Sequence, residues 1–450
     1  MTAPPTFGWG RILRLGLVQA ALGAVVVMTT STLNRVMVVE LALPALLPGL
    51  LVAIHYLVQV ARPRMGYGSD LGRRRTPWIV GGMTVLATGG VAAAVATAWM
   101  GRDATAGIAL AVVAFLMIGL GVSASGTSLL VLLAKRVAPS RRAAAATVVW
   151  LMMIAGFAVT AGLAGKLLDP YTPWRLVQVS FGVSVIALAV TLLALHRLEG
   201  DDGVPDGAME APAAARPSFR NALAQAWTEP AARRFTFFIF VSMLAFSAQD
   251  LILEPFAGTV FGYSPGASTQ LSGVQHGGVL TGMLLVAAAG SGVAGPRWRS
   301  LRAWTVGGCL ASGVALMGLV RIGLSGDGTW LGLTVFLLGA ANGAFSIAAI
   351  ASMMRLAGQG RQSREGTRMG LWGGAQAVAF GLGGLVGTAA SDVARWLVGT
   401  PAQAYAAVFA LEALLFVGAA LLAARVETAP ARGIRHRSLD AASGVGMEAR

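Results

Sequence analysis

Residues 66–78, GYGSDLGRRRTPW, place one aspartate and three consecutive arginines between two strongly apolar segments. Gly66 and Gly68 permit close helix approach and backbone angles that other residues disfavour. Asp70 is suited to pair with an arginine or to cap the start of a helix. The pattern predicts a short charged turn between two helices.

The composition indicates that this solvent is a lipid bilayer. The chain has 450 residues, of which 56% are hydrophobic and 12% charged, and its mean hydropathy is +0.71. These values lie outside the range of soluble domains. Apolar blocks of about 20 residues match a hydrocarbon core about 30 Å thick, and they lack the alternation of a transmembrane barrel. We therefore expect an all-α membrane protein, whose first apolar stretch stays as a helix because it has no convincing cleavage site.

Twelve apolar spans are predicted, in two halves of six. The predicted units are a first bundle at 1–197, a cytoplasmic linker at 198–232, a second bundle at 233–426 and a disordered cytoplasmic tail at 427–450. The linker segment at 217–230 has the apolar spacing of an amphipathic surface helix. The span centres are predicted near Ala24, Leu51, Ala87, Met117, Ile154, Ile186, Met243, Leu284, Gly313, Leu337, Phe380 and Leu415.

The basic residues predict the orientation of the chain. Arginines gather in alternate loops, and by the positive-inside rule these loops, the linker and both termini are cytoplasmic. The net charge of +15 then reflects topology, and we expect no nucleic-acid partner. The one cysteine, Cys309, lies in a predicted span, which excludes an intramolecular disulfide and argues against a thiol catalyst.

Three echoes about 220 residues apart support two related halves. RTPWIVGG at 75–82 returns as RAWTVGG at 302–308, and SRRAAAATVVW at 140–150 returns as SREGTRMGLW at 363–372. NRVMVVEL at 34–41 is echoed by QDLILEPF at 249–256. All three fall at corresponding places in the two halves, which is typical of transporters with parallel repeats.

The opening stretch resembles the loop motif between the second and third helices of the major facilitator superfamily. Gly66, Asp70, Gly72, Arg73 and Arg74 carry the resemblance, with one residue fewer between the aspartate and the following glycine than the usual pattern. The resemblance implies a charge latch that holds one conformation closed on the cytoplasmic side. The alternative is that these arginines only set the topology.

A narrower resemblance covers nearly the whole chain. TLNRVMVVELALPALLPGLLVAIH (32–55), RPRMGYGSD (62–70), QDLILEPFAGTVFG (249–262) and AYAAVFALEALLF (404–416) resemble the PucC and LhaA family, a branch of the major facilitator superfamily in phototrophic bacteria. The resemblance implies handling of bacteriochlorophyll or a late precursor in the inner, intracytoplasmic membrane. Light-harvesting apoproteins, the reaction-centre complex or bacteriochlorophyll synthase are the implied partners. The compact loop at 66–78 departs from the antenna-assembly members and predicts a third subgroup linked to pigment synthesis.

Two histidines are candidates for the axial ligand of a pigment magnesium. His55 and His276 fall in the second and eighth spans, which are equivalent helices of the two halves, whereas the other two histidines fall in cytoplasmic segments. A neutral imidazole can supply one ligand, and a polar side chain in lipid is a functional hypothesis by default. His55 is the first candidate and His276 the second. The alternative is that both are hydrogen-bonded packing residues.

Four acidic residues are the other candidates in the membrane. Glu40, Asp250 and Glu254 lie near the ends of the first and seventh spans, and Asp250 and Glu254 share a face if the helix does not end at Pro255. They are interpreted as a gate, a proton site or magnesium ligands, or else as interfacial partners of a residue such as Arg35. Glu412 in the last span is better placed for a buried role, or for pairing with a neighbouring helix.

Two functions remain open from the residues. Glycine runs such as GGAQAVAFGLGGLVG permit close helix packing or a flat face for a macrocycle, and they lack the lysine of a phosphate loop. No nucleophile and base are evident, so we expect no enzymatic activity. The chain is either a pigment-handling assembly factor or a secondary transporter of a small solute, coupled to protons through Glu412, Asp250 or Glu254.

Overall fold

The chain is built from helices. The computed structural model describes residues 7–59, 74–138, 141–199, 227–290, 300–358 and 365–426, and within these ranges it contains helices and no strands. The all-α prediction is therefore confirmed. The helices are α1 (Trp9–Val27), which continues through η1 (Met28–Thr32), α2 (Leu33–Arg35) and η2 (Val36–Glu40), then α3 (Leu46–Val58), α5 (Thr76–Met100), α6 (Ala104–Arg136), α7 (Arg142–Leu168), α8 (Pro173–Leu195), α10 (Pro230–Phe261), α11 (Pro265–Gly290), α12 (Leu301–Ser325), η7 (Gly328–Trp330), α13 (Leu331–Gly358), α14 (Glu365–Val398) and α15 (Pro401–Val426).

Every predicted span centre lies inside a helix. Among the described residues, eleven helices are long and apolar enough to cross a membrane, and α3 is a shorter apolar helix. A multi-pass membrane protein is therefore established by length and composition. The count of twelve crossings stays a prediction, because the chain after α3 lies outside the described residues.

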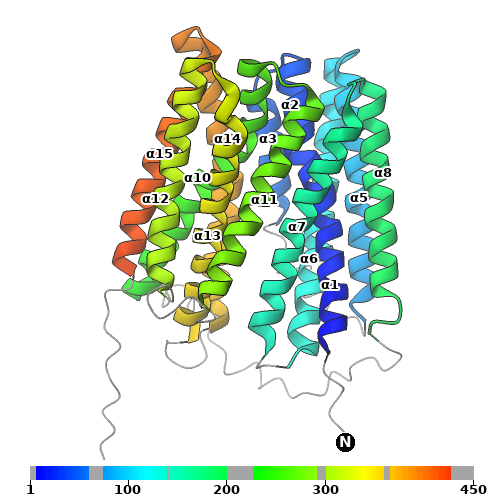
Figure 1. Ribbon diagram of the computed structural model, residues 1–450. Coiled ribbons are helices and arrows are strands. Elements are labelled where there is room, and N and C mark those ends of the chain that lie inside the picture. The colour runs from blue at the N-terminus through cyan, green and yellow to red at the C-terminus, as the bar shows by residue number, and fades with distance from the viewer. Residues whose placement is uncertain are drawn as a thin grey trace, which may run out of the picture.

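The two halves repeat the same helix packing. In the first half α5 packs on α6 and α8, α1 on α7 and α8, and α3 on α6. In the second half α12 packs on α13 and α15, α10 on α14 and α15, and α11 on α13. The same ordinal helices pair in each half, so the fold consists of two pseudo-symmetric bundles, which stand side by side in Figure 1.

The two bundles meet through exchanged helix pairs. The fifth helix of the first half, α7, packs on the second helix of the second half, α11, and α14 packs on α3 in the same way. The start of α1 and the end of α15 lie at the same, lower side in Figure 1, which we call the terminal side. The opposite side is called the far side.

Exposed tryptophans mark both membrane surfaces. Trp78 and Trp99 lie near opposite ends of α5, separated by 21 residues, which is about 32 Å of helix and matches a hydrocarbon core of about 30 Å. Exposed tryptophans at the terminal side are Trp9, Trp78 and Trp227, and those at the far side are Trp99, Trp174, Trp330 and Trp396. Tryptophan is enriched at membrane interfaces, so the apolar belt between the two sets faces lipid.

Candidate functional site

The first helix changes its winding where it meets the second bundle. Its π-helical stretches η1 and η2 flank α2 and bring buried polar side chains to the bundle interface. Thr32 bonds Thr269 of α11 with 3.1 Å between the hydroxyl oxygens, and Asn34 donates to the Leu251 carbonyl of α10. Such π-helical turns are frequent at functional sites, and here they form a polar seam between the bundles.

Pro255 explains why Asn34 finds an acceptor on α10. The sequence left open whether the helix ends at Pro255, and the structure shows that α10 continues to Phe261. A proline inside a helix has no N–H to donate to the carbonyl four residues earlier, which is that of Leu251. Asn34 bonds that carbonyl from the first bundle, and the helix continues with its free acceptor satisfied across the interface.

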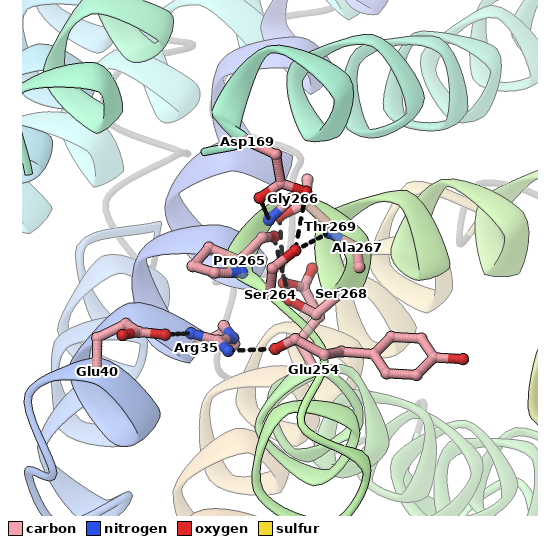
Figure 2. A network of polar contacts seen from close by, with 11 residues as sticks. Arg35, Glu40, Asp169, Glu254, Ser264, Pro265, Gly266, Ala267, Ser268 and Thr269 are labelled. Atoms are coloured by element: carbon pink, nitrogen blue, oxygen red, sulfur yellow. Dashed lines mark hydrogen bonds and ion pairs between the residues drawn. The ribbon is translucent and has the colours of Figure 1, made fainter. Parts of the chain in front are cut away.

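Arg35 is the cation of this seam. Its side chain is 2% exposed, forms an ion pair with Glu40 of η2, and donates to the Tyr263 carbonyl with 2.5 Å between nitrogen and oxygen. Figure 2 shows Arg35 reaching from the first bundle towards Glu40 on one side and the second bundle on the other. A Cβ on Gly258 would lie 2.9 Å from the guanidinium, so a glycine is needed where α10 crosses it.

Glu254 lies on the same side of α10 and is almost fully buried. The Thr269 hydroxyl is 3.5 Å from its carboxylate, and the charge of Arg35 also acts on it. The hydroxyls of Ser31 and Ser272, from opposite bundles, are 3.4 Å apart beside it. The predicted candidates Glu40 and Glu254 therefore both lie close to Arg35, one partly exposed and one inside.

Tyr171, in the loop between α7 and α8, borders the same charges. Burial and then the nearby charge of Glu40 raise the pKa of Tyr171 to about 12, with Arg35 acting in the opposite direction. Its phenol is therefore protonated at every physiological pH. A neutral aromatic group thus covers the far-side edge of the Arg35 pair.

Two aspartates cap helices of the opposite bundle at the far side. Asp169, after α7, accepts from the Ser264 hydroxyl (2.8 Å) and from the Gly266 N–H (3.3 Å) at the start of α11, as Figure 2 shows. Asp392 of α14 accepts from the N–H groups of Ala45 (3.0 Å) and Leu46 (2.7 Å) at the start of α3. A carboxylate at a helix N-terminus satisfies free N–H groups and the helix dipole. The caps are reciprocal and join the bundles twice.

His276 lies on the face of α11 that looks into the interface. Its Nδ1 is 2.9 Å from the Ser272 carbonyl, so Nδ1 carries the proton and donates. The Phe157 ring of α7 meets its ring edge-on at 5.0 Å between centroids. With Nδ1 as the donor, the neutral form of this imidazole keeps its Nε2 lone pair, as an axial ligand requires.

His55 occupies the equivalent helix but has a different environment. Its Nε2 lies 2.9 Å from the Gln59 side-chain nitrogen, and its ring meets Tyr56 edge-on at 4.8 Å. A Cβ on Gly119 would lie 2.7 Å from the His55 carbonyl oxygen, so α6 packs directly on this turn. Nε2 of His55 is therefore engaged by a side chain of its own helix, whereas the hydrogen bond of His276 engages Nδ1.

The remaining carboxyls lie inside the second bundle. Gln275 donates to Asp250 at 3.1 Å. Glu412 is 2% exposed, and neither of its oxygens has a hydrogen-bond partner among the described residues. Asp250 and Glu412 act electrostatically on each other, whereas Glu254 turns towards Arg35. The candidates of the second half therefore form two neighbouring groups.

Most of the loop motif falls outside the described residues. Gly66, Asp70, Gly72 and Arg73 are among the positions that the structure leaves undescribed, while Arg74 is exposed just before α5. The latch interpretation of the motif stays a prediction. What the structure does show is Glu199, after α8, accepting from the N–H groups of Arg75 (2.9 Å) and Thr76 (2.8 Å) at the start of α5.

Sequence reasoning missed Asp169, Asp392 and Glu199. The positions of Asp169 and Asp392 offered a weak signal, because both lie near the predicted far-side end of the fifth helix of their half. Glu199 begins the acidic stretch that was assigned to the linker, so its role as the cap of α5 was not predicted. In each case the partner is a helix start on another segment, and only the fold brings the two together.

Comparisons with known proteins agree with this architecture. The family model described as PUCC protein matches residues 32–430. A Rhodobacter capsulatus protein named bacteriochlorophyll synthase 44.5 kDa chain is 52% identical over 426 residues, covering 94% of this chain and 97% of the relative. Protein PucC from Rhodobacter capsulatus is 32% identical over 426 residues, covering 90% of each chain.

Solved structures with a similar fold are transporters. A peptide transporter POT in complex with sulfate has a TM-score of 0.68 at 13% identity, over 93% of this chain and 95% of that one. The nucleoside transporter NupG has a TM-score of 0.63 at 13% identity, over 93% and 100%. At these identities the likeness shows the fold alone, and it confirms a major-facilitator-type fold.

Proposed function

The chain belongs to the PUCC protein family, and from this premise we propose that it binds a bacteriochlorophyll-type pigment within the membrane and delivers it during assembly of photosynthetic light-harvesting complexes. The names of its relatives support a link to this pigment. The transporter fold supports carriage of a ligand between two bundles. The single observation that carries the proposal is the state of His276.

His276 has the chemistry that a magnesium-centred macrocycle requires. The bond from Nδ1 to the Ser272 carbonyl fixes the tautomer and the ring orientation, as hydrogen-bonded carbonyls do for metal-ligating histidines in general. When a bacteriochlorophyll is bound, its magnesium would take one axial nitrogen ligand, and His276 Nε2 fits that role. The edge of Phe157 limits rotation of the imidazole.

The surroundings of His276 suit the apolar part of such a pigment. Val279 and Met283 follow it by one and two turns on α11 and pack with Ile154 of α7 in a buried cluster that both bundles share. Partly buried aromatic and sulfur-containing side chains border this cluster, namely Trp150, Met153, Phe157 and Trp304. Methionine and aromatic side chains adapt to large apolar ligands. The polar seam thus lies on the far side of His276, and the apolar cluster lies on its terminal side.

The relatives also favour a particular branch of the family. Identity to the relative named as a synthase chain is 52%, against 32% to PucC, which supports the predicted third subgroup linked to pigment synthesis. We therefore propose bacteriochlorophyll synthase as the first partner, ahead of light-harvesting apoproteins and the reaction-centre complex. The chain carries pigment and does not itself catalyse the synthase reaction. It resides in the inner, intracytoplasmic membrane.

The terminal side is proposed to face the cytoplasm, and the bundles to span 1–197 and 233–426. The arginine-rich loops support this orientation. Reporters fused to each end test it: both should report a cytoplasmic location. A periplasmic signal from either end contradicts the topology.

A proton-coupled transporter of a small solute is the second candidate. The buried carboxyls of Glu254 and Glu412 and the partly buried carboxyl of Asp250 favour it, because ionisable groups inside a membrane bundle commonly serve proton relays. This candidate predicts a colourless protein that catalyses solute flux in vesicles.

The deciding experiment is purification in mild detergent from a pigmented host. We expect pigment to remain through affinity and size-exclusion steps at a fixed ratio to protein, with a spectrum different from that of free pigment in the same detergent. The control is the same chain purified from a host without pigment and then mixed with free pigment. A colourless protein that takes up no pigment contradicts the proposal.

A further inference from the structure

A layer of polar side chains crosses the interior of the second bundle. Phe246 of α10, Phe345 of α13 and Phe416 of α15 form an aromatic layer, with ring centroids 6.5 Å apart for the first pair and 5.6 Å for the second. Because α10 runs towards the far side and α13 and α15 run away from it, the residues one turn to the far side are Gln249 and Asp250, Asn342, and Glu412.

The layer continues onto α12 and α11. Ser312 of α12 donates to the Asn342 side chain at 2.8 Å, and Gln275 of α11 donates to Asp250 at 3.1 Å. Gln249 and Asn342 are completely buried, and among the described residues both atoms of the Gln249 amide and the Asn342 amide nitrogen have no hydrogen-bond partner. Unpaired buried polar groups are rare and need an explanation.

Glu412 is the member of the layer with the largest unmet requirement. Both of its oxygens are buried without a partner in the described part of the chain. An ionised carboxylate buried in this way is very unfavourable unless a cation or several donors reach it. The charged group of the described residues that acts on it electrostatically is Asp250, another acid.

The cations that contact α15 lie far from Glu412. Arg395 of α14 bonds the Tyr405 hydroxyl, about 10 Å from Glu412 along the helix axis. Arg302 of α12 and Arg234 of α10 bond the carbonyls of Ala424 and Arg425, about 18 and about 20 Å from Glu412 on the other side. Among residues whose side chains the structure describes, the remaining titratable or charged groups of the helices packed on α15 are Cys309 and Arg321 of α12, Arg233, Asp250 and Glu254 of α10, and Asp392 of α14. Within the described part of the chain, the surroundings of Glu412 therefore offer repulsion from Asp250 and no neutralising cation.

We propose that Glu412 and Asp250 form a proton-binding site inside the second bundle, in which Glu412 holds a proton in the conformation described here. The bound species is a single proton, which joins a carboxylate oxygen to give a neutral carboxyl, and returns to water when the bundle rearranges. The proposal concerns a site apart from His276 and does not depend on pigment.

The site is connected to the bundle interface through α10. Asp250 and Glu254 are four residues apart, so their side chains lie one turn apart on one face. Glu254 feels the charge of Arg35 across the interface. A change in the charge of Asp250 therefore alters the electrostatic environment of Glu254, which lies next to Arg35. Proton binding at Asp250 and Glu412 is thereby coupled to the contact that Arg35 makes between the two bundles.

Carbodiimide labelling of the purified full-length protein tests the site. Dicyclohexylcarbodiimide enters apolar regions and adds to protonated carboxyls, and trypsin then releases the peptide Trp396–Arg425, in which Glu412 is the one acidic residue. The peptide Ile322–Arg355 is a matched control from the same digest, with Asp327 as its one acidic residue. Asp327 is fully exposed, and hydrogen bonds from Thr329 lower its pKa, so it stays ionised.

We expect about tenfold or more label on the Glu412 peptide relative to the Asp327 peptide at neutral pH, because one decade in proton affinity changes a small protonated fraction by that factor. Glu412→Gln should abolish the label, and its size and neutrality should preserve the fold. Asp250→Asn removes the repelling charge and should reduce the label severalfold. An unlabelled Glu412 peptide, label confined to Asp250, or equal labelling of the two peptides would overturn the proposal.

Discussion

The reciprocal caps at the far side predict a specific change in the contact between the bundles. Asp169 and Asp392 each cap a helix of the opposite bundle, so replacing both with alanine removes contacts that exist only when the far side is closed. Loss of a capping side chain costs about 0.5–2 kcal/mol, so the pair is worth about 1–4 kcal/mol. Since each 1.4 kcal/mol is a factor of about ten, the ratio of closed to open molecules should fall between about fivefold and several hundredfold.

Spin labels at the far side measure this change. Arg102, between α5 and α6, and Thr329, before α13, are exposed and belong to different bundles. Cys309 is completely buried inside α12, so it should not take up label. Pulsed electron paramagnetic resonance on the R102C/T329C protein should give one distance for the parent. The D169A/D392A variant should add a longer component.

Asp103→Ala is the matched control for this experiment. Asp103 caps its own helix, accepting from the Ala106 N–H at 3.0 Å, so its loss removes the same kind of bond within one bundle. It should lower stability by about the amount of one cap, about 0.5–2 kcal/mol, and leave the distance unchanged. The reasoning is refuted if D169A/D392A keeps the parent distance, or if D103A lengthens it equally.

Three further substitutions test the seam and the start of α5. Arg35→Gln removes the ion pair with Glu40 and the hydrogen bond to the Tyr263 carbonyl and should cost about 1–3 kcal/mol, measured by thermal unfolding in detergent; adding Glu40→Gln should cost little more, and full additivity would contradict the coupling. Gly258→Ala places a Cβ 2.9 Å from the guanidinium and should cost about 1–3 kcal/mol, whereas Gly307→Ala, with nothing within 4 Å, should be neutral or stabilising. Glu199→Ala removes the cap of α5 and should cost about 0.5–2 kcal/mol; an unchanged melting temperature would show that the cap is not needed.

The sequence predicted the helices and their grouping because both depend on local composition. Apolar segments of membrane length become helices wherever lipid surrounds them, and the repeated segments predicted the paired bundles. Pro255 shows where local rules end. A proline considered by its local sequence favours the end of a helix. Here Asn34, 217 residues away in the sequence, donates to the carbonyl that Pro255 leaves without a helical partner. No pattern within α10 predicts that partner.

The same limit applied to the site. His55 and His276 were correctly placed on equivalent helices, yet their order as ligands depends on which nitrogen is engaged and by what. Gln59 occupies Nε2 of His55, whereas the Ser272 carbonyl occupies Nδ1 of His276. Both partners are four residues from their histidine, so spacing alone could not predict which nitrogen is engaged; the orientation of each side chain decides it.

The proposal that His276 ligates a bacteriochlorophyll is tested most directly by comparing two alanine variants purified from the same pigmented host. Pigment-to-protein ratio and absorption spectrum are measured for the parent, His276→Ala and His55→Ala. The state of the two imidazoles predicts that His276→Ala loses most of the pigment or shifts its spectrum, while His55→Ala keeps the parent ratio and spectrum. Equal pigment and identical spectra in the parent and His276→Ala would contradict the central claim.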